Sequence, residues 1–201
     1  TVGRLGKEKS FDVVLKAVAE LAREEDVFLV HIGEGPELPH LKALAKELGV
    51  ADRVLFLGPV PYRRIGGYFR LAGLFLSASE TGTQGLVIWE AQAMGVPVVA
   101  VGAEGVLEGV EDGKTGFLVP PGDFRALAEK ALELLKDEER RRRFSLQARA
   151  FALKRSAETI AEQIVAVYDE ASEILRVEPR RLIFPFPRLP RSSLEDRPGG
   201  F

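Results

Sequence analysis

The first segment that could do chemistry is a loop near the start of the chain, residues 3–9, with the sequence GRLGKEK. It carries three cations, Arg4, Lys7 and Lys9, and leads into a helical pattern that begins after Ser10. Backbone N–H groups at a helix start, combined with basic side chains, favour binding of a phosphate or diphosphate. The loop matches neither the G-x-G-x-x-G dinucleotide pattern nor the P-loop pattern. The alternative is that these cations form surface ion pairs.

The second such segment is residues 79–95, SETGTQGLVIWEAQAMG, which contains a helix start. The N–H groups at that start point toward any anion held there. Glu90 lies about one and a half turns further on, among apolar residues. A buried carboxylate without a partner is costly, so Glu90 must reach a cleft or a partner, and the two hydroxyls of a ribose could donate to it. The alternative is a surface carboxylate paired with a basic neighbour. The residues that frame the helix start are Thr83, Gln84, Gly85, Leu86 and Val87.

Composition excludes several other functions. The 201 residues are 46% hydrophobic and 29% charged, which is typical of a soluble globular protein with its own core. The net charge of -2 argues against nucleic acid as a partner. Cysteine is absent, so disulfides, thiolate nucleophiles and cysteine-bound zinc are excluded. His31 and His40 lack the spacing of a metal site, so we expect structural roles for both and no metal.

Targeting signals are also missing from the sequence. No apolar stretch approaches the roughly 20 residues that span a bilayer, and no secretory signal pattern is present. These features predict a cytoplasmic location. The first residues, Thr1 to Gly3, are typical of the end of a strand, so we expect this chain to be part of a longer protein.

The pattern along the chain alternates between short apolar strands and amphipathic helices. Such alternation predicts an α/β fold, a doubly wound parallel sheet covered by helices on both faces. Ligands of these sheets bind beyond the carboxyl ends of the strands. Ser10 and Asp123 are expected to cap helices, and Gly49 to end one. The predicted helices are 11–24, 37–48, 61–71, 85–94, 123–135, 137–152 and 156–175, and the predicted strands are 27–32, 53–57, 74–78, 96–101 and 116–119.

A change of composition divides the chain near residue 175. Residues 1–175 are predicted to form one domain. Residues 176–201 hold five prolines and six arginines and show no helical or strand period, which favours a poorly ordered tail. The alternative is a basic, aromatic anchor at a membrane surface.

Five motifs in order resemble glycosyltransferase family 4, the glycosyl transferases group 1, over residues 1 to about 170. They are VGRLGKEKS, HIGEGPEL, RVLFLGPVP, TQGLVIWEAQAMGVPVVA and DGKTGFLVPPGD. The resemblance implies two Rossmann-like domains that face each other across a cleft, with this chain as the C-terminal, donor-binding one. It also implies transfer of a hexose from a nucleotide diphosphate sugar, with retention at the anomeric carbon and without a metal or other cofactor.

The resemblance assigns a role to each candidate residue. Arg4 and Lys9 match the basic pair that binds the donor diphosphate and stabilises the departing nucleotide. Glu90 matches the second glutamate of a paired motif, the one that holds the ribose. The nucleobase is expected near the backbone of Gly58, Val60 and Pro61. The other donor-binding positions are Gly3, Gly82, Thr83, Gln84, Gly85, Leu86 and Val87.

One position departs from the family pattern. The first glutamate of the pair falls eight positions before Glu90, and Gly82 stands there. Its absence puts the positioning of the sugar in doubt, unless Glu80 or a backbone amide substitutes. The alternative to an active enzyme is therefore a catalytically degenerate module that binds a nucleotide or a partner protein. Nucleotide-sugar epimerisation is a third alternative, but its carboxylates and histidines are not recognisable here.

The resemblance also bears on the acceptor and the partners. The form SETGTQGL is similar to that of bacterial enzymes that glucosylate diacylglycerol, which favours UDP-glucose as donor, glycolipid or polysaccharide biosynthesis, and a peripheral position on the inner face of the membrane. In the family the N-terminal domain supplies the acceptor site. The chain alone is therefore expected to bind a nucleotide and to catalyse little or nothing.

Overall fold

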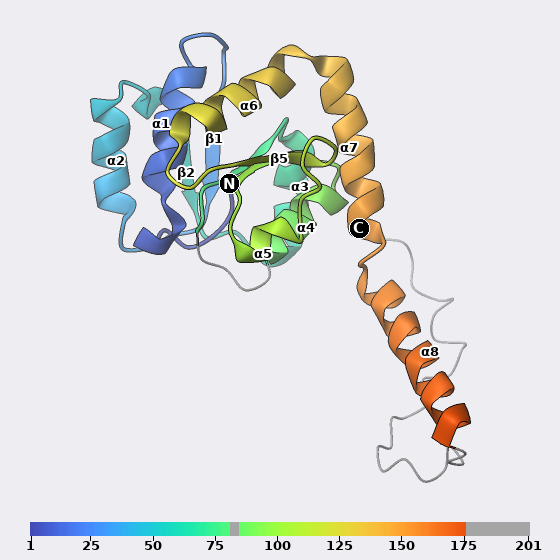
Figure 1. The fold of residues 1–201 in the computed structure, drawn as a ribbon. Coiled ribbons are helices and arrows are strands. Elements are labelled where there is room, and N and C mark those ends of the chain that lie inside the picture. Colours follow the sequence, from blue (N-terminus) through green and yellow to red (C-terminus); the bar gives the residue numbers. More distant parts are fainter. Residues whose placement is uncertain (81–84, 176–201) are drawn as a thin grey trace. The chain divides into compact units, whose positions relative to one another are not determined.

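The structure is a computed structural model that describes residues 1–80 and 85–175. The chain divides into two compact units, Thr1–Ser156 and Ala157–Phe201 (Figure 1). The described part of the second unit is one helix, α8 (Ala157–Leu175). Among the described helices, none combines the length and the apolar character needed to cross a bilayer.

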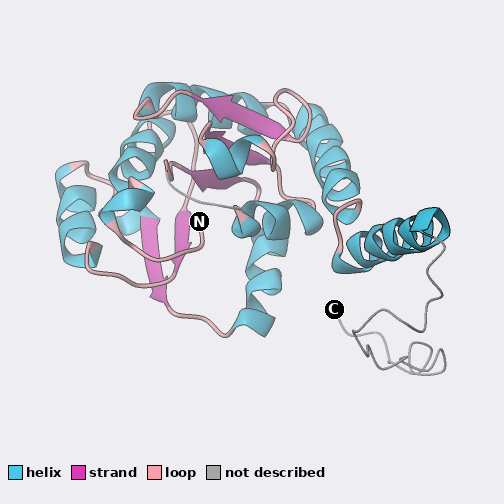
Figure 2. Ribbon diagram, turned by 60° about the horizontal axis from the view of Figure 1, so that its bottom comes forward, coloured by secondary structure: helices cyan, strands magenta, loops and turns pink. Residues whose placement is uncertain are grey.

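The strands of the first unit all pair in parallel, in two sheets (Figure 2). The smaller sheet pairs β1 (Leu29–Ile32) with β2 (Val54–Gly58). The larger has the order β3 (Phe75–Ser77), β4 (Val98–Val101), β5 (Gly116–Val119). The predicted α/β class, with parallel strands flanked by helices, is confirmed. The single sheet expected from the sequence is instead two, because β1 and β3 do not pair with each other.

The helices agree closely with the predicted ranges. One turn of helix, α5, was not predicted, because four residues that include Gly105 show no helical period. The elements of the first unit are η1 (Lys7–Lys9), α1 (Phe11–Leu21), α2 (Leu38–Glu47), η2 (Ala51–Arg53), α3 (Tyr62–Leu71), α4 (Leu86–Ala93), α5 (Glu104–Leu107), α6 (Phe124–Lys136) and α7 (Glu138–Leu153).

Alternation along the strands gives the first unit two apolar clusters, one on each face of the sheets. On β4, Val99 belongs to the cluster that holds α1 and α6, whereas Val98 belongs to the cluster that holds Ile88 of α4. Neighbouring residues of a strand point to opposite faces, so a strand buried on both faces must be apolar throughout. This explains the uninterrupted VVAV of β4, all of which is buried.

Local signals place the helix ends. Asp123 caps α6 as predicted, and its carboxylate accepts hydrogen bonds from the N–H groups of Arg125 and Ala126 at 3.1 and 2.9 Å. Ser10 precedes α1 as predicted, but its side chain makes no capping hydrogen bond, because its backbone is left-handed with φ 44°. Gly49 follows α2 with φ +72°, a conformation that glycine adopts without strain.

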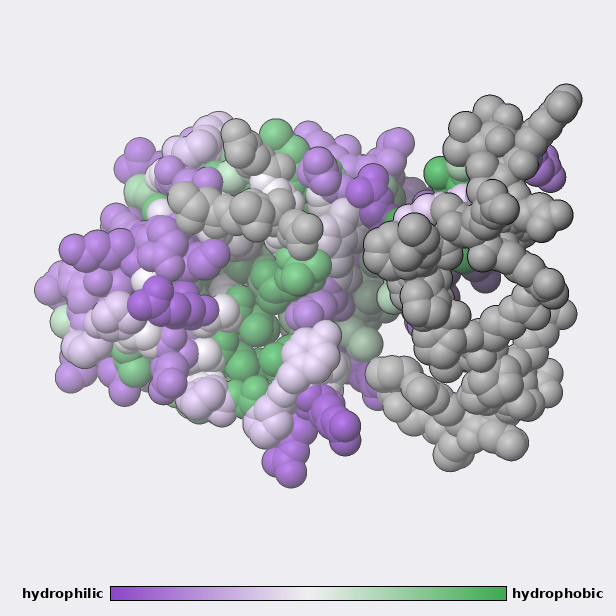
Figure 3. Space-filling model, turned by 90° about the horizontal axis from the view of Figure 1, so that it is seen from below, coloured by the Kyte–Doolittle hydropathy of each residue, from purple (hydrophilic) through white to green (hydrophobic). Residues whose placement is uncertain are grey.

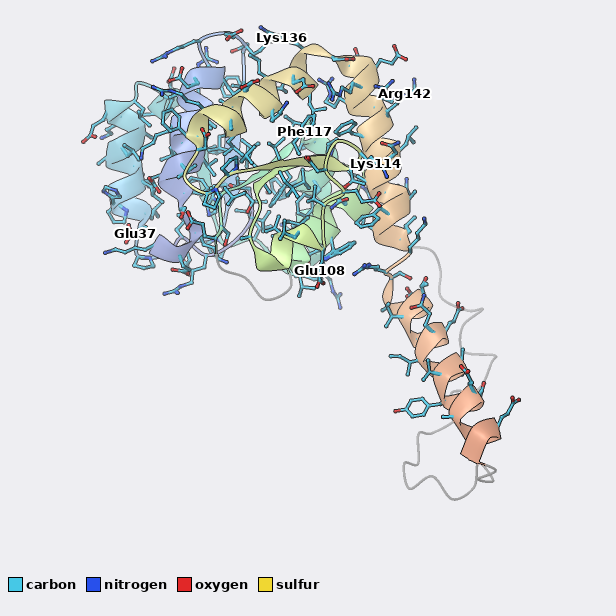
Figure 4. All side chains as sticks on the ribbon, viewed as in Figure 1. Glu37, Glu108, Lys114, Phe117, Lys136 and Arg142 are labelled. Carbon is cyan, nitrogen blue, oxygen red and sulfur yellow. The ribbon has the colours of Figure 1, made fainter. Side chains whose placement is uncertain are left out.

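Helix α7 closes the first unit through aromatic contacts. Phe144 of α7 packs on Phe117 of β5, with ring centroids 5.3 Å apart. Phe117, labelled in Figure 4, also has Lys130 and Arg140 over its ring at 4.9 and 5.1 Å. Trp89 of α4 stacks on Phe151 at 5.2 Å. The contact between Trp89 and Phe151 holds α4, whose first turn is a candidate binding element, against α7.

Candidate nucleotide-binding site

The candidate residues that the structure describes lie in loops that follow the strands and precede the helices. Gly58, Val60 and Pro61 stand at and after the end of β2, and Gly85 stands between β3 and α4. In Figure 1 the dark-blue loop of residues 3–10, α4 and α5 all lie toward the lower edge of this unit. Parallel sheets bind ligands beyond the carboxyl ends of their strands, and these loops occupy that edge.

The basic loop rests on the backbone of the segment that follows β1. Gly3 N–H donates to the carbonyl of Ile32 at 2.9 Å, and Leu5 N–H donates to that of Glu34 at 3.0 Å. A Cβ atom on Gly35 would lie 2.2 Å from the carbonyl oxygen of Leu5, and one on Gly33 would lie 1.9 Å from that of Gly3. The two glycines of HIGEGPEL therefore let the basic loop pack closely, a role that the sequence did not reveal.

Of the two predicted diphosphate-binding cations, Lys9 contacts the segment that leads to α4. Its Nζ donates to Ser79 Oγ at 3.3 Å, and Ser79 follows β3. Arg4 instead pairs with Glu8 at 3.8 Å, and 68% of its side chain is exposed. Within residues 1–80 and 85–175, Lys9 therefore contacts the segment that follows β3, and Arg4 pairs within its own loop. Ser79 belonged to the second chemical segment, yet its type alone gave no sign of this contact.

Helix α4 begins at Leu86, as the sequence predicted, because Gly85 reverses the chain with φ +52°. A Cβ atom on Gly85 would lie 2.8 Å from the carbonyl oxygen of Gly105, so a larger residue is disfavoured there. Leu86 is exposed and Val87 is half-buried. The remaining predicted residues of this segment, Gly82, Thr83 and Gln84, lie outside the described residues.

Glu90 has a partner that the sequence did not identify. Its Oε1 accepts a hydrogen bond from the hydroxyl of Tyr62 at 3.1 Å, where a basic neighbour was the alternative. This hydrogen bond, with the negative charge of Glu90, raises the pKa of the Tyr62 phenol above its ordinary value. Tyr62 is 71% exposed and begins α3, directly after Pro61. Its only signal in the sequence was that position, beside the loop expected to meet the base.

The predicted base-binding loop is joined to the segment after β1. Gly33 N–H donates to the carbonyl of Gly58 at 2.9 Å, and Gly58 has φ +75°. Val60 is half-buried, and Pro61 is exposed. Seen from below, the first unit shows an apolar area at its centre with polar residues around it (Figure 3).

The two histidines differ in burial. His40 is exposed on α2, whereas His31 on β1 is 2% exposed and packs edge-on against Phe11 at 4.7 Å. His31 Nδ1 lies 2.9 Å from Thr1 Oγ1, and its Nε2 has no hydrogen-bond partner among the described residues. Within residues 1–80 and 85–175, no group of three or more metal-binding side chains is gathered.

Burial of His31 predicts a loss of stability in acid. Desolvation, helped by the nearby N-terminal ammonium and opposed by the backbone of Gly3, lowers its pKa to about 4. Between pH 6.5 and 4 the unfolded chain binds a proton here that the folded chain does not, so stability falls as the pH falls. We expect His31→Gln to remove about 1 to 2 kcal/mol of the loss in unfolding free energy between pH 7 and 4.5, measured by urea denaturation. Identical losses in both proteins would contradict this assignment.

Comparison with known proteins gives the family. Residues 1–151 match the family model of glycosyl transferases group 1. The chain is 34% identical over 168 residues to N-acetyl-alpha-D-glucosaminyl L-malate synthase of Bacillus anthracis, covering 83% of this chain and 44% of that protein. It is 37% identical over 178 residues to D-inositol 3-phosphate glycosyltransferase of Nocardia farcinica, covering 85% and 40%. The chain thus spans less than half the length of these relatives.

Solved structures agree with this relationship. The crystal structure of Anabaena Alr3699/HepE in complex with UDP superposes with a TM-score of 0.76 at 29% identity, covering 84% of this chain and 48% of that one. The C-terminal domain of a glycosyl transferase group 1 family protein, LpcC of Francisella tularensis, gives a TM-score of 0.70 at 25% identity, covering 77% and 83%. The chain belongs to the glycosyl transferases group 1 family.

Proposed function

We propose that this chain is the donor-binding domain of a retaining glycosyltransferase that transfers a hexose from a nucleotide diphosphate sugar. The observation that carries the proposal is the contact between Lys9 and Ser79, which joins the basic loop to the segment that leads to α4. Ser79 precedes the start of α4 in the chain, and a cation together with the N–H groups of a helix start is a combination that favours a diphosphate. The UDP bound by the related HepE structure supports the same ligand class.

Each candidate residue has a distinct role in this proposal. Lys9 and Arg4 bind the diphosphate and stabilise the negative charge that develops on it as the sugar departs. Glu90 accepts hydrogen bonds from the ribose hydroxyls, and Tyr62, its present partner, lies beside the base-binding loop. Arg4 must leave Glu8 to take part, which its exposure allows at little cost because surface ion pairs are weak.

The rest of the enzyme belongs to the same proposal. We infer that an N-terminal domain outside this sequence supplies the acceptor site, so the chain alone binds nucleotide but transfers no sugar. The donor is UDP-glucose or a related hexose, no metal takes part, and the acceptor is a lipid or glycolipid at the inner face of the membrane. The metal-free mechanism rests on the resemblance to the family as a whole, and the donor and acceptor rest on the resemblance of SETGTQGL to glucosyl enzymes of glycolipid assembly.

Calorimetric titration of the chain in EDTA tests the function. UDP, GDP and ADP identify the base, and UDP-glucose and GDP-mannose then identify the sugar. We expect saturable binding to one nucleotide series, with the sugar nucleotide bound at least as well as the bare diphosphate. Binding of the diphosphate with a weaker sugar nucleotide would favour the catalytically degenerate module, and binding of none would contradict the proposal for this chain.

Lys9→Met tests the diphosphate contact, with Lys7→Met as its matched control. Both variants lose one positive charge from η1, but Lys9 is half-buried beside Ser79 whereas Lys7 is exposed. A hydrogen bond to a charged group contributes about 1.5 kcal/mol or more, so we expect Lys9→Met to raise the Kd of the preferred diphosphate about tenfold and Lys7→Met to change it little. An equal rise in Kd for the two variants would show that Lys9 contributes to binding only through the positive charge that it adds to the loop.

A further inference from the structure

The contact between Tyr62 and Glu90 joins two parts of the candidate site that lie 28 positions apart in the sequence. Tyr62 is the first residue of α3 and follows Pro61 of the predicted base-binding loop, whereas Glu90 lies in the second turn of α4. The phenol hydroxyl donates to Oε1 of the carboxylate at 3.1 Å. The chain therefore supplies a hydrogen-bond donor of its own to the residue that is the candidate for binding a ribose.

The phenol offers Glu90 the same kind of group that a ribose offers. Each is a neutral hydroxyl that donates to an ionised carboxylate, which makes a charge-assisted hydrogen bond. A carboxylate that holds both hydroxyls of a ribose accepts one on each oxygen, so it needs Oε1 as well as Oε2. Tyr62 therefore takes one of the two acceptor atoms that a ribose requires.

Burial limits the directions from which a ligand can reach this carboxylate. Glu90 is half-buried, and its neighbour in α4, Ala91, is fully buried. A ligand must therefore approach the carboxylate from its solvent side. Tyr62 is 71% exposed, and its phenol meets the carboxylate from that side. The aromatic ring thus occupies the space through which a ribose would reach Oε1.

Tyr62 can leave Glu90 without disturbing the core. Tyr62 stands at the exposed start of α3, and the helix is anchored at its other end by Phe69, which is 4% exposed and packs on Phe75 at 5.9 Å. A rotamer change of an exposed side chain is fast and needs no movement of the helix. Exchange of the phenol for a ribose hydroxyl also leaves the half-buried carboxylate with a hydrogen-bond partner throughout.

We propose that Tyr62 is an internal competitor of the nucleotide: its hydroxyl and the ribose bind Glu90 in turn, so Tyr62 lowers the affinity of the site for ribonucleotides. This inference rests on the proposed function, because it takes Glu90 as the ribose-binding residue. The apparent Kd of a ligand rises by the inverse of the fraction of molecules that are free to bind it. A hydrogen bond of ordinary net strength shifts an equilibrium about two- to tenfold, so the contact raises Kd about three- to tenfold.

Tyr62→Phe tests the competition, with Tyr68→Phe as its matched control. Both variants remove one phenol hydroxyl from α3 and keep the ring, but among the described residues it is Tyr62 that donates to Glu90. The ligand is whichever of UDP, GDP and ADP the parent chain binds most tightly. We expect Tyr62→Phe to lower its Kd about three- to tenfold in calorimetric titration, and Tyr68→Phe to leave it unchanged. A hydroxyl that held Glu90 in place for the ribose would have the opposite effect, because its removal would raise Kd.

Two comparisons show whether the gain in affinity passes through Glu90 and the ribose. The 2′,3′-dideoxy form of the same diphosphate makes no demand on Glu90, so the parent chain and Tyr62→Phe should bind it with equal Kd. In the Glu90→Ala background the competitor has lost its target, so adding Tyr62→Phe should leave Kd unchanged. A gain that persists in either comparison would overturn the proposal.

A measurement on the chain without nucleotide separates the contact from binding. The sequence has three tyrosines, and pH titration of their ring NMR signals gives the pKa of each phenol. Because Glu90 raises the pKa of Tyr62, Glu90→Ala should lower that pKa toward its ordinary value. An unchanged pKa for all three tyrosines would show that the contact does not form in solution and would overturn the proposal.

The binding results distinguish this proposal from the proposed function. Equal or weaker binding of the diphosphate by Tyr62→Phe, in a parent chain that binds it, would overturn the competition and leave the donor-binding function intact. Absence of binding by the parent chain and by both tyrosine variants would contradict the donor-binding function for this chain, and the competition would be overturned with it.

Discussion

Gly35→Ala is expected to destabilise the chain by about 3 kcal/mol, a loss of roughly 6 to 12 °C in Tm for a protein of this size. The added Cβ would lie 2.2 Å from the carbonyl oxygen of Leu5 and 2.7 Å from its nitrogen. Both atoms are backbone, and Leu5 is fully buried, so no side chain can rotate away to relieve the overlap. The segment of residues 33–36 or the basic loop must move, and thermal unfolding measures the cost.

Gly67→Ala is the matched control for this prediction. Gly67 lies in α3, and a Cβ atom there would meet nothing within 4 Å. Alanine is favoured over glycine inside a helix by up to about 1 kcal/mol, so this variant should gain slightly in stability. A fall of similar size in both variants would show that the contact with Leu5 is not the cause. Weaker nucleotide binding by the folded Gly35→Ala protein is a further expectation, because Leu5 adjoins Arg4.

Glu90→Ala is expected to weaken binding of the preferred nucleotide by roughly 1 to 3 kcal/mol without unfolding the domain. Glu90 is half-buried, and among the described residues the hydrogen-bond partner of its side chain is the exposed Tyr62. Losing a contact with an exposed phenol should cost the fold little, whereas a ribose would lose two charge-assisted hydrogen bonds. Calorimetry measures the affinity, and thermal unfolding measures the stability.

Two controls isolate the ribose contact. Glu108→Ala removes the same charge from an exposed position after α5 and should leave affinity unchanged. A 2′,3′-dideoxynucleotide lacks both hydroxyls, so its affinity should be the same for the parent chain and for Glu90→Ala. A large fall in Tm with unchanged affinity would instead make Glu90 a structural residue.

Most secondary structure followed from the sequence because its signals are local. Helical spacing, Gly49 after α2 and Asp123 before α6 act within a few residues of the elements that they define. The uninterrupted apolar strands predicted a parallel sheet with helices on both faces, and the parallel pairing and the flanking clusters agree. The motif order also predicted the family correctly, since five motifs in one sequence are far more specific than any one of them.

Tertiary structure decided which residues of the candidate site meet. Lys9 and Ser79 are 70 positions apart, and Tyr62 and Glu90 are 28 apart, so neither pair could be read from local patterns. The need for glycine at positions 33 and 35 depends on another segment, the basic loop, which packs on them. The sequence alone therefore determined most of the elements and the chemical types of the candidate site residues. Contacts between distant segments were decided by the fold, because packing and hydrogen bonding across loops depend on where the strands bring them.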